Sequence, residues 1–176
     1  MIELRAPLPS DVEALHPLVA GTGVADTLLW DGPASLDEYR RTWLIFVEEV
    51  ARGGRQTFTI VETATGAVIG TAGLRPVAGS DAAPWFRADI GLFIGIPYQG
   101  RGYGTAAVRQ LLDVGFGKLG LEKIEAAVFV GNVASRRIFE KNGFVLEGTI
   151  RKAVRKRGRL VDEWLLGIVR EERVSA

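Results

Sequence analysis

The chain has 176 residues, with 22 lysines and arginines against 21 aspartates and glutamates, and a hydrophobic content of 47%. This length suits a single domain over residues 1–176, and the balanced charge gives no overall attraction to nucleic acid. The absence of cysteine excludes disulfides, thiolate metal sites and a cysteine nucleophile. No basic start precedes an apolar run, and no apolar stretch approaches about 18 residues. We therefore expect a cytoplasmic protein without a membrane span.

The first part of the chain predicts a strand followed by two helices. Residues 2–6 alternate between apolar and polar side chains, as a half-buried strand does. Each helix is expected to begin at a serine that a glutamate follows three residues later, Ser10 with Glu13 and Ser35 with Glu38. In this capping-box pattern the two side chains satisfy backbone N–H groups that the helix leaves free.

The rest of the chain continues as an alternation of strands and helices. Thr65 and Gly66 are typical of the turn of a β-hairpin, and Asn132 of a helix N-cap. The predicted elements are strands over 57–62, 67–77 and 86–96, a helix carrying Val108, Leu111, Leu112 and Phe116 on one face, a strand over 123–130, a helix from Asn132, and a strand over 162–169. With a further strand between the last helix and residues 162–169, the expected order is β-α-α-β-β-β-α-β-α-β-β, which predicts one mixed α/β domain.

The stretch PYQGRGYGTAAV, residues 97–108, places three glycines directly before a helix. Glycines let the backbone approach a ligand closely, and successive N–H groups at a helix N-terminus favour an anion. The pattern therefore predicts a cradle for a phosphate-bearing ligand, and a plain flexible turn is the alternative.

Two nucleotide-binding motifs fit this stretch less well. Walker A needs Gly-Lys-Ser/Thr after the glycines, and that tripeptide is absent. The dinucleotide fingerprint is matched by Gly102-x-Gly104-x-x-Ala107. It also needs an acidic residue after the next strand, where this chain reads VFVGN.

The stretch resembles the pyrophosphate loop of the GNAT superfamily of acetyl-CoA-dependent N-acetyltransferases, which reads Gln/Arg-x-x-Gly-x-Gly/Ala. Gln99, Gly102 and Gly104 occupy its defined positions. A second segment, VGNVASRRIFEKNGFVLEG, is similar to the family's Asn-x-x-Ser…Gly-Phe motif through Asn132 and Ser135. The segments LRAPLPSDVEAL and WLLGIV also resemble the ribosomal-protein N-terminal acetyltransferase (RimJ/RimL-like) branch.

The resemblance implies the GNAT fold, a central mixed, mostly antiparallel sheet of about seven strands flanked by about four helices and splayed at the third/fourth strand. It implies acetyl-CoA as cosubstrate and no metal. The coenzyme contacts it implies are Gln99, Gly100, Arg101, Gly102, Tyr103, Gly104 and Thr105 for the pyrophosphate, Leu92, Phe93 and Ile94 for the pantetheine arm, and Asn132, Ser135 and Phe139 toward the thioester end.

The resemblance also implies catalytic residues. Without cysteine, direct transfer to an amine is expected, and the amine must lose a proton before it attacks. Asp89 lies where some members carry a catalytic glutamate, and Ser135 matches a serine proposed as acid in the N-terminal acetyltransferase branch. The alternative for Asp89 is a plain outward-facing residue on the strand. The alternative for Ser135 is a helix residue that hydrogen-bonds the first turn of its own helix. Phe139 occupies the position at which many members have a tyrosine. The branch can carry a glutamate after the Gly-Phe segment, and the nearest position in this chain is Val154.

Residues 151–159 read RKAVRKRGR and form a strongly basic run. Such a run is usually a solvated hairpin. It could also receive an acidic protein surface, RNA phosphate or the coenzyme's 3′-phosphate, and it disfavours polycationic substrates. Trp30, Trp43 and Trp85 could line an amine site, with packing in the core as the alternative.

The favoured hypothesis is therefore an acetyl-CoA-dependent N-acetyltransferase acting on a protein N-terminus or on a small amine such as an antibiotic or polyamine. A non-catalytic acyl-CoA-binding sensor is the second hypothesis, and an RNA-associated accessory protein the third. The resemblance implies a possible homodimer. No membrane partner and no sequence-specific nucleic-acid binding are expected.

Overall fold

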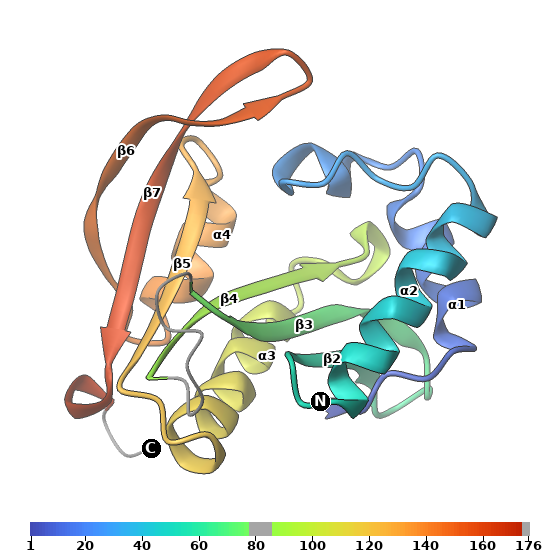
Figure 1. Cartoon of the computed structure of the whole chain (residues 1–176), viewed down its shortest axis with the longest axis horizontal. Helices are drawn as coiled ribbons and strands as arrows, with labels where there is room; N and C mark the ends of the chain where they lie inside the picture. The colour runs from blue at the N-terminus through green and yellow to red at the C-terminus, as the bar shows by residue number, and fades with distance from the viewer. Residues whose placement is uncertain (78–85, 174–176) are drawn as a thin grey trace. The chain divides into compact units, whose positions relative to one another are not determined.

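The computed structural model of the chain describes residues 1–77 and 86–173. Its strands form one seven-stranded mixed sheet in the order β1-β2-β3-β4-β5-β7-β6 (Figure 1). The elements are β1 (Ile2–Arg5), α1 (Asp11–Val19), α2 (Leu36–Ala51), β2 (Gln56–Glu62), β3 (Val68–Pro76), β4 (Arg87–Ile94), α3 (Tyr103–Leu112), β5 (Lys123–Phe129), α4 (Val133–Glu140), β6 (Val145–Lys156) and β7 (Arg159–Val169). The predicted mixed α/β class and the order of elements are confirmed. None of the helices in the described residues is long and apolar enough to cross a membrane.

The chain divides into two compact units, of which the first comprises Met1–Gly73 and Leu92–Ala107. In this unit β1 pairs antiparallel with β2, from Ile2↔Glu62 to Arg5↔Thr59. Helices α1 and α2 pack against each other, as Figure 1 shows in blue and cyan. Their buried side chains form one core cluster, which contains Val12, Leu15, Val19, Val24, Ala25, Tyr39 and Trp43.

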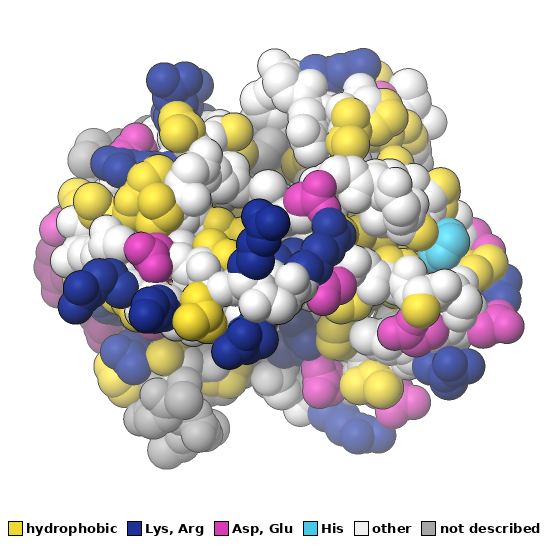
Figure 2. Space-filling view, turned by 90° about the horizontal axis from the view of Figure 1, so that it is seen from above, with side chains coloured by type: hydrophobic (Ala, Val, Ile, Leu, Met, Phe, Trp, Pro, Cys, Tyr) yellow, Lys and Arg dark blue, Asp and Glu magenta, His cyan; other side chains and the backbone are white. Residues whose placement is uncertain are grey.

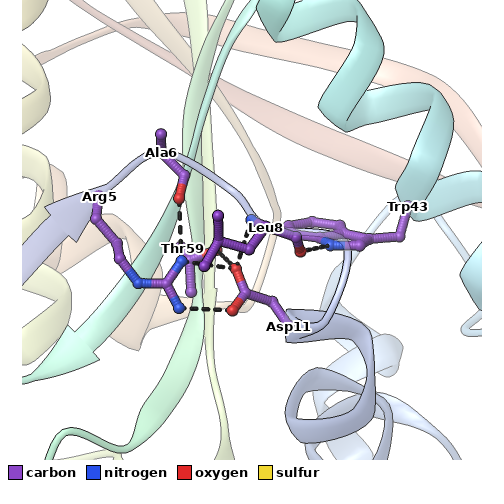
Figure 3. Close-up of polar contacts among 6 residues, drawn as sticks. All are labelled: Arg5, Ala6, Leu8, Asp11, Trp43 and Thr59. Carbon is purple, nitrogen blue, oxygen red and sulfur yellow. Dashed lines mark hydrogen bonds and ion pairs between the residues drawn. The ribbon is translucent and has the colours of Figure 1, made fainter.

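The predicted cap at Ser35 is confirmed, but the one at Ser10 is wrong. The Ser35 hydroxyl accepts the N–H of Glu38 at 3.1 Å, whereas the Ser10 side chain makes no capping hydrogen bond. The next residue, Asp11, is 4% exposed and accepts from both Arg5 guanidinium nitrogens, the Thr59 hydroxyl and the Leu8 N–H (Figure 3). A buried carboxylate with four donors therefore organises this turn in place of the serine.

Replacing Asp11 with alanine is expected to lower the free energy of unfolding by about 3 kcal/mol, because the Arg5 guanidinium and the Thr59 hydroxyl would lose their partner. Burial raises the pKa of Asp11, but Arg5, Thr59 and Leu8 together outweigh it and lower the pKa overall. The stabilisation is then complete above the ordinary carboxyl range and is lost as the pH falls below it. Urea unfolding of the wild type and Asp11→Ala at several pH values measures both effects. Glu13→Ala removes an exposed ion-pair partner of Arg40 and should change stability little; an equal loss in both variants would contradict this role of Asp11.

The second unit comprises Leu74–Gly91 and Val108–Ala176. Here β5 pairs antiparallel with β7 from Lys123↔Val169 to Phe129↔Glu163, and parallel with β4 from Arg87↔Lys123 to Asp89↔Glu125. Side chains of paired residues share a face of the sheet, so Asp89, Glu125 and Glu163 lie on one face. The predicted apolar stripe of α3 and the residues after it is confirmed, since Val108, Leu111, Leu112 and Phe116 are all buried.

Helix α4 begins where the sequence predicts. The Asn132 side-chain oxygen accepts the N–H of Ser135 at 3.1 Å, which confirms Asn132 as the N-cap. The helix carries Arg136, whose guanidinium lies 4.9 Å from the Trp164 ring centre and pairs with Glu140. These contacts attach α4 to the face of β7 opposite to the one that bears Glu163.

Candidate functional site

The glycine-rich segment forms an exposed loop that leads into α3. Gly100 and Gly102 adopt φ values of +75° and +80°, and an added Cβ at either position would meet nothing within 4 Å. The glycines are therefore required by the backbone conformation, because other residues adopt positive φ only at a cost. Close packing against neighbouring protein atoms does not require them.

This loop fits an anionic group. In the part of the chain that the structure describes, the backbone N–H groups of Gly100, Arg101 and Gly102 donate to no other residue. They precede the N-terminus of α3, where the helix dipole adds partial positive charge. The open space over Gly100 and Gly102 leaves room for a ligand against the backbone. Exposed amides, open space and a ten-residue helix are the features that a pyrophosphate requires.

A carboxylate that the sequence did not reveal anchors this loop. Glu62, at the end of β2, accepts the Tyr103 hydroxyl at 2.5 Å and lies 3.6 Å from the Arg101 guanidinium. The other Glu62 oxygen accepts the Thr65 hydroxyl at 2.7 Å. The Tyr103 hydrogen bond is the main cause that lowers the pKa of Glu62. Glu62 and Tyr103 are 41 positions apart, so no local pattern joins them.

Replacing Glu62 with glutamine is expected to weaken acetyl-CoA binding by about 3- to 10-fold, because the loop loses a charged acceptor that holds Tyr103 and Arg101 in place. Calorimetric titration with acetyl-CoA measures this change. Glu49→Gln, which removes a partner of Arg55 in the same unit, is the control and should leave the affinity unchanged. Equal affinities for all three proteins would contradict an anchoring role for Glu62.

The strand end before the loop carries the residues predicted for the pantetheine arm. Leu92 and Phe93 are partly buried and Ile94 is buried. The carbonyl of Ile94 accepts the side-chain amide of Gln99 at 2.8 Å. The Gln99 side chain thus fastens the loop to the end of β4, and any ligand amide at Ile94 would share that carbonyl.

In the second unit, Asp89 lies on β4 beside Arg75. The Arg75 Nε donates to Asp89 Oδ2 at 2.7 Å, and 18% of the Asp89 side chain is exposed. Burial raises the pKa of Asp89; Arg75 opposes this rise, and the negative charge of Glu125 adds to it. A carboxylate with a raised pKa is suited to accept a proton near neutral pH. The contact with Arg75 also fits a structural ion pair, whereas the alternative of an outward-facing strand residue fits poorly with a side chain that is mostly buried.

Glu163 is a second carboxyl on the same face, and sequence reasoning missed it. It lies on β7 opposite Phe129 and is only 7% exposed. Burial is the main cause that raises the pKa of Glu163, and the negative charge of Asp89 raises it further. The strand DEWLLGIV gave no sign of this pairing, because β5 separates β4 from β7 in the sheet.

The α4 residues predicted for the thioester end lie close together on that helix. Ser135 is partly buried and its N–H is held by Asn132. Phe139 is 3% exposed and packs edge-on against Phe144, with ring centres 5.1 Å apart. Coenzyme contacts by Asn132, Ser135 and Phe139 stay predictions.

Two of the three tryptophans predicted for an amine site can be described. Trp43 is buried and donates its ring N–H to the Leu8 carbonyl at 2.7 Å. Trp30 packs partly buried against the same core cluster, with its ring 5.4 Å from that of Tyr39. Both contacts fit the alternative of core packing. Trp85 lies outside the described residues. Within 1–77 and 86–173, no group of three or more His, Asp or Glu side chains is placed to hold a metal ion.

Several curated relatives of this chain are N-acetyltransferases by name. The chain is 32% identical over 120 residues to the uncharacterized N-acetyltransferase p20 of Bacillus licheniformis, covering 68% of this chain and 65% of that protein. It is 42% identical over 82 residues to the probable N-acetyltransferase YjcK of Bacillus subtilis strain 168, covering 47% of this chain and 45% of that protein. The chain thus spans about half to two thirds of the length of these relatives.

The fold is also that of solved acetyltransferases. A spermidine N-acetyltransferase from Vibrio cholerae, solved in complex with CoA and spermine, superposes with a TM-score of 0.83. The alignment covers 99% of this chain and 98% of that one at 22% identity, which is a likeness of fold. Residues 2–145 match the family model described as an acetyltransferase (GNAT) domain. The chain therefore belongs to the GNAT acetyltransferase family.

Proposed function

We propose that this protein transfers an acetyl group from acetyl-CoA directly to a primary amine. The observation that carries the proposal is the loop before α3, in which the amides of Gly100, Arg101 and Gly102 are unpaired and the space over Gly100 and Gly102 is open. Family membership supports the same reaction. The thioester of acetyl-CoA supplies an activated acetyl group when the coenzyme is bound.

The loop residues hold the coenzyme in this proposal. The Gln99 N–H donates to the Ile96 carbonyl at 3.1 Å and is not free for the ligand. The amides of Gly100, Arg101, Gly102, Tyr103 and Gly104 face the pyrophosphate, and the Thr105 hydroxyl adds a donor. The Arg101 guanidinium, 54% exposed, adds positive charge there. Leu92, Phe93 and Ile94 lie along the pantetheine arm, with Asn132, Ser135 and Phe139 toward its thioester end. Glu62 acts through Tyr103 as a positioning residue.

Asp89 removes the proton from the acceptor amine. An alkyl ammonium has a pKa well above neutrality, so the reaction needs an acceptor for the proton that the amine loses as it attacks, and a carboxylate beside the amine provides one. The raised pKa of Asp89, caused mainly by burial, brings it closer to the operating pH. Ser135 is the proposed proton donor to the leaving thiolate. Phe139 has no ionisable proton, so the tyrosine acid of other members has no counterpart at that position.

The acceptor is either a protein N-terminus, as the RimJ/RimL-like features suggest, or a small amine. Calorimetric titration with acetyl-CoA, followed by an assay for free thiol with N-terminal peptides and small amines, tests the proposal. Binding with thiol release on one class of amine supports it. Binding without release on every class supports the non-catalytic acyl-CoA sensor, for which Phe139 and Val154 are the motivating departures. No binding would contradict both.

A further inference from the structure

The β6–β7 hairpin concentrates positive charge in a molecule that is nearly neutral. Residues 151–159 contain six lysines and arginines and no acidic residue, whereas the whole chain has a net charge of +1. Arg151, Lys152, Arg155, Arg157 and Arg159 are all exposed. Figure 2 views the molecule from above Figure 1, which is the end at which this hairpin turns. Several Lys and Arg side chains face the viewer near the middle of that view.

Arg151 and Lys152 stand out among these cations, because they lie in a β-bulge. Between the pairs Ile150↔Glu163 and Val154↔Val161, the residues 151–153 of β6 oppose the single residue Asp162 of β7. Lys152 has a φ of +52°, and its N–H donates to Asp162 Oδ1 at 2.7 Å. A lysine adopts this conformation only at a cost. Bulges of this kind redirect side chains and are over-represented near active sites.

The bulge borders a hollow that is the size of a small-molecule site. The hollow has a volume of about 480 Å³ and is lined by Arg151 and Lys152, within the range of ligand pockets. Neither side chain forms an ion pair within the described residues. The Asp162 carboxylate at the bulge is engaged by the Lys152 backbone. Two unpaired cations beside a hollow favour an anionic group there.

The bulge also lies next to the carboxyl groups of this unit. Glu163 pairs with Ile150, the residue directly before Arg151. Since a strand advances about 3.3 Å per residue, the cations and the Glu163 backbone are only about 3–7 Å apart along the hairpin. Glu163 shares its face of the sheet with Asp89. Two carboxyl groups, which suit an amine, therefore lie next to two cations, which suit an anion.

We propose that Arg151 and Lys152 bind a carboxylate of the acceptor, so that the preferred acceptors are amines that carry a carboxylate close by. The proposal rests on the acetyl-transfer function proposed above and names its substrate class. The carboxylate has two possible sources, the α-carboxylate of a free amino acid and the acidic side chains of a peptide N-terminus. Polycations are disfavoured, because Arg151 and Lys152, which form no ion pair within the described residues, repel them.

The proposal is tested by measuring thiol release from matched pairs of acceptors at saturating acetyl-CoA. Each free L-amino acid is compared with its amide, the peptide Ser-Glu-Glu with Ser-Gln-Gln, and both sets with spermidine. The amide is the weaker base and has more free amine at neutral pH, so higher kcat/KM for the acid cannot arise from amine basicity. Preference within the first pair identifies amino acids, and preference within the second identifies acidic peptides.

Variants show whether Arg151 and Lys152 in the bulge cause the preference for carboxylate acceptors. Arg151→Gln and Lys152→Asn should each raise KM for the preferred carboxylate acceptor about 10-fold or more, with kcat nearly unchanged. Asparagine tolerates positive φ, so the second change keeps the bulge. Arg159→Gln removes an exposed cation of the same hairpin that does not line the hollow, and should have little effect.

Three results would overturn the proposal: amides or spermidine used as well as the acids, unchanged KM in both bulge variants, or an equal rise in KM for Arg159→Gln, which would indicate only a general electrostatic field. These results all require thiol release from some amine. An absence of thiol release from every class, neutral and cationic amines included, would instead contradict the proposed acetyl transfer and this subsite with it.

Discussion

Replacing Asp89 with asparagine is expected to lower kcat by about 100-fold or more, with little change in the affinity for acetyl-CoA. Asparagine has nearly the same shape and still accepts the Arg75 Nε–H, which lies 2.7 Å from Asp89 Oδ2. It cannot take a proton from the acceptor amine. Thiol release measures kcat, and calorimetry measures the affinity. Glu171→Gln, which changes an exposed carboxylate, should match the wild type. Full activity of Asp89→Asn across the pH range would remove Asp89 as the base.

The pH dependence gives an independent test of Asp89. The rate should fall as the pH drops through the raised pKa of Asp89, because the protonated carboxyl no longer accepts a proton. Arg75 lowers that pKa. The variant Arg75→Gln should therefore move the acid limb of the kcat profile to higher pH. An acid limb that stays in place in Arg75→Gln would show that another group controls it.

Replacing Gly102 with valine is expected to abolish measurable binding of acetyl-CoA. Gly102 has a φ of +80°, a conformation that a β-branched residue adopts only with strain. The new side chain would also fill the open space over the loop, where the pyrophosphate is proposed to lie. Calorimetric titration of the variant against the wild type measures the loss.

The chain offers a matched control for this substitution. Gly53 follows α2 with a φ of +76°, and an added Cβ there meets nothing within 4 Å. Gly53→Val should therefore impose similar backbone strain, and its cost in thermal stability should be comparable. If Gly102→Val bound acetyl-CoA as tightly as Gly53→Val, the loop would be only a turn.

Local patterns in the sequence predicted most of the fold. The apolar stripe from Val108 to Phe116 is buried, and the cap residues Ser35 and Asn132 hold their helices. The Ser10 pattern failed, because the adjacent Asp11 meets Arg5 and Thr59 in the folded chain and so determines the turn itself. A capping motif is read from its own residues, whereas these competing partners come from other strands.

The candidate site likewise contains parts that local sequence patterns predict and parts that they do not. Its glycine loop could be predicted, because positive φ and close backbone approach require a particular residue type at a particular spacing. Glu62 and Glu163 could not, since each matters through a partner on another element, Tyr103 in one case and Asp89 in the other. The bulge at Lys152 was equally hidden, because a lysine in a left-handed conformation leaves no compositional trace.

The double hydrogen bonding of Glu62 has a practical consequence for labelling this protein. Turns with exposed small residues, such as the one at Thr65 and Gly66, are usually good places for a tag or a fluorescent reporter. Here the Thr65 hydroxyl and the Tyr103 hydroxyl bind the two oxygens of the same carboxylate. A group inserted at this turn would therefore disturb the loop that starts α3. The same link makes the turn a suitable position for a dye whose signal responds to coenzyme binding.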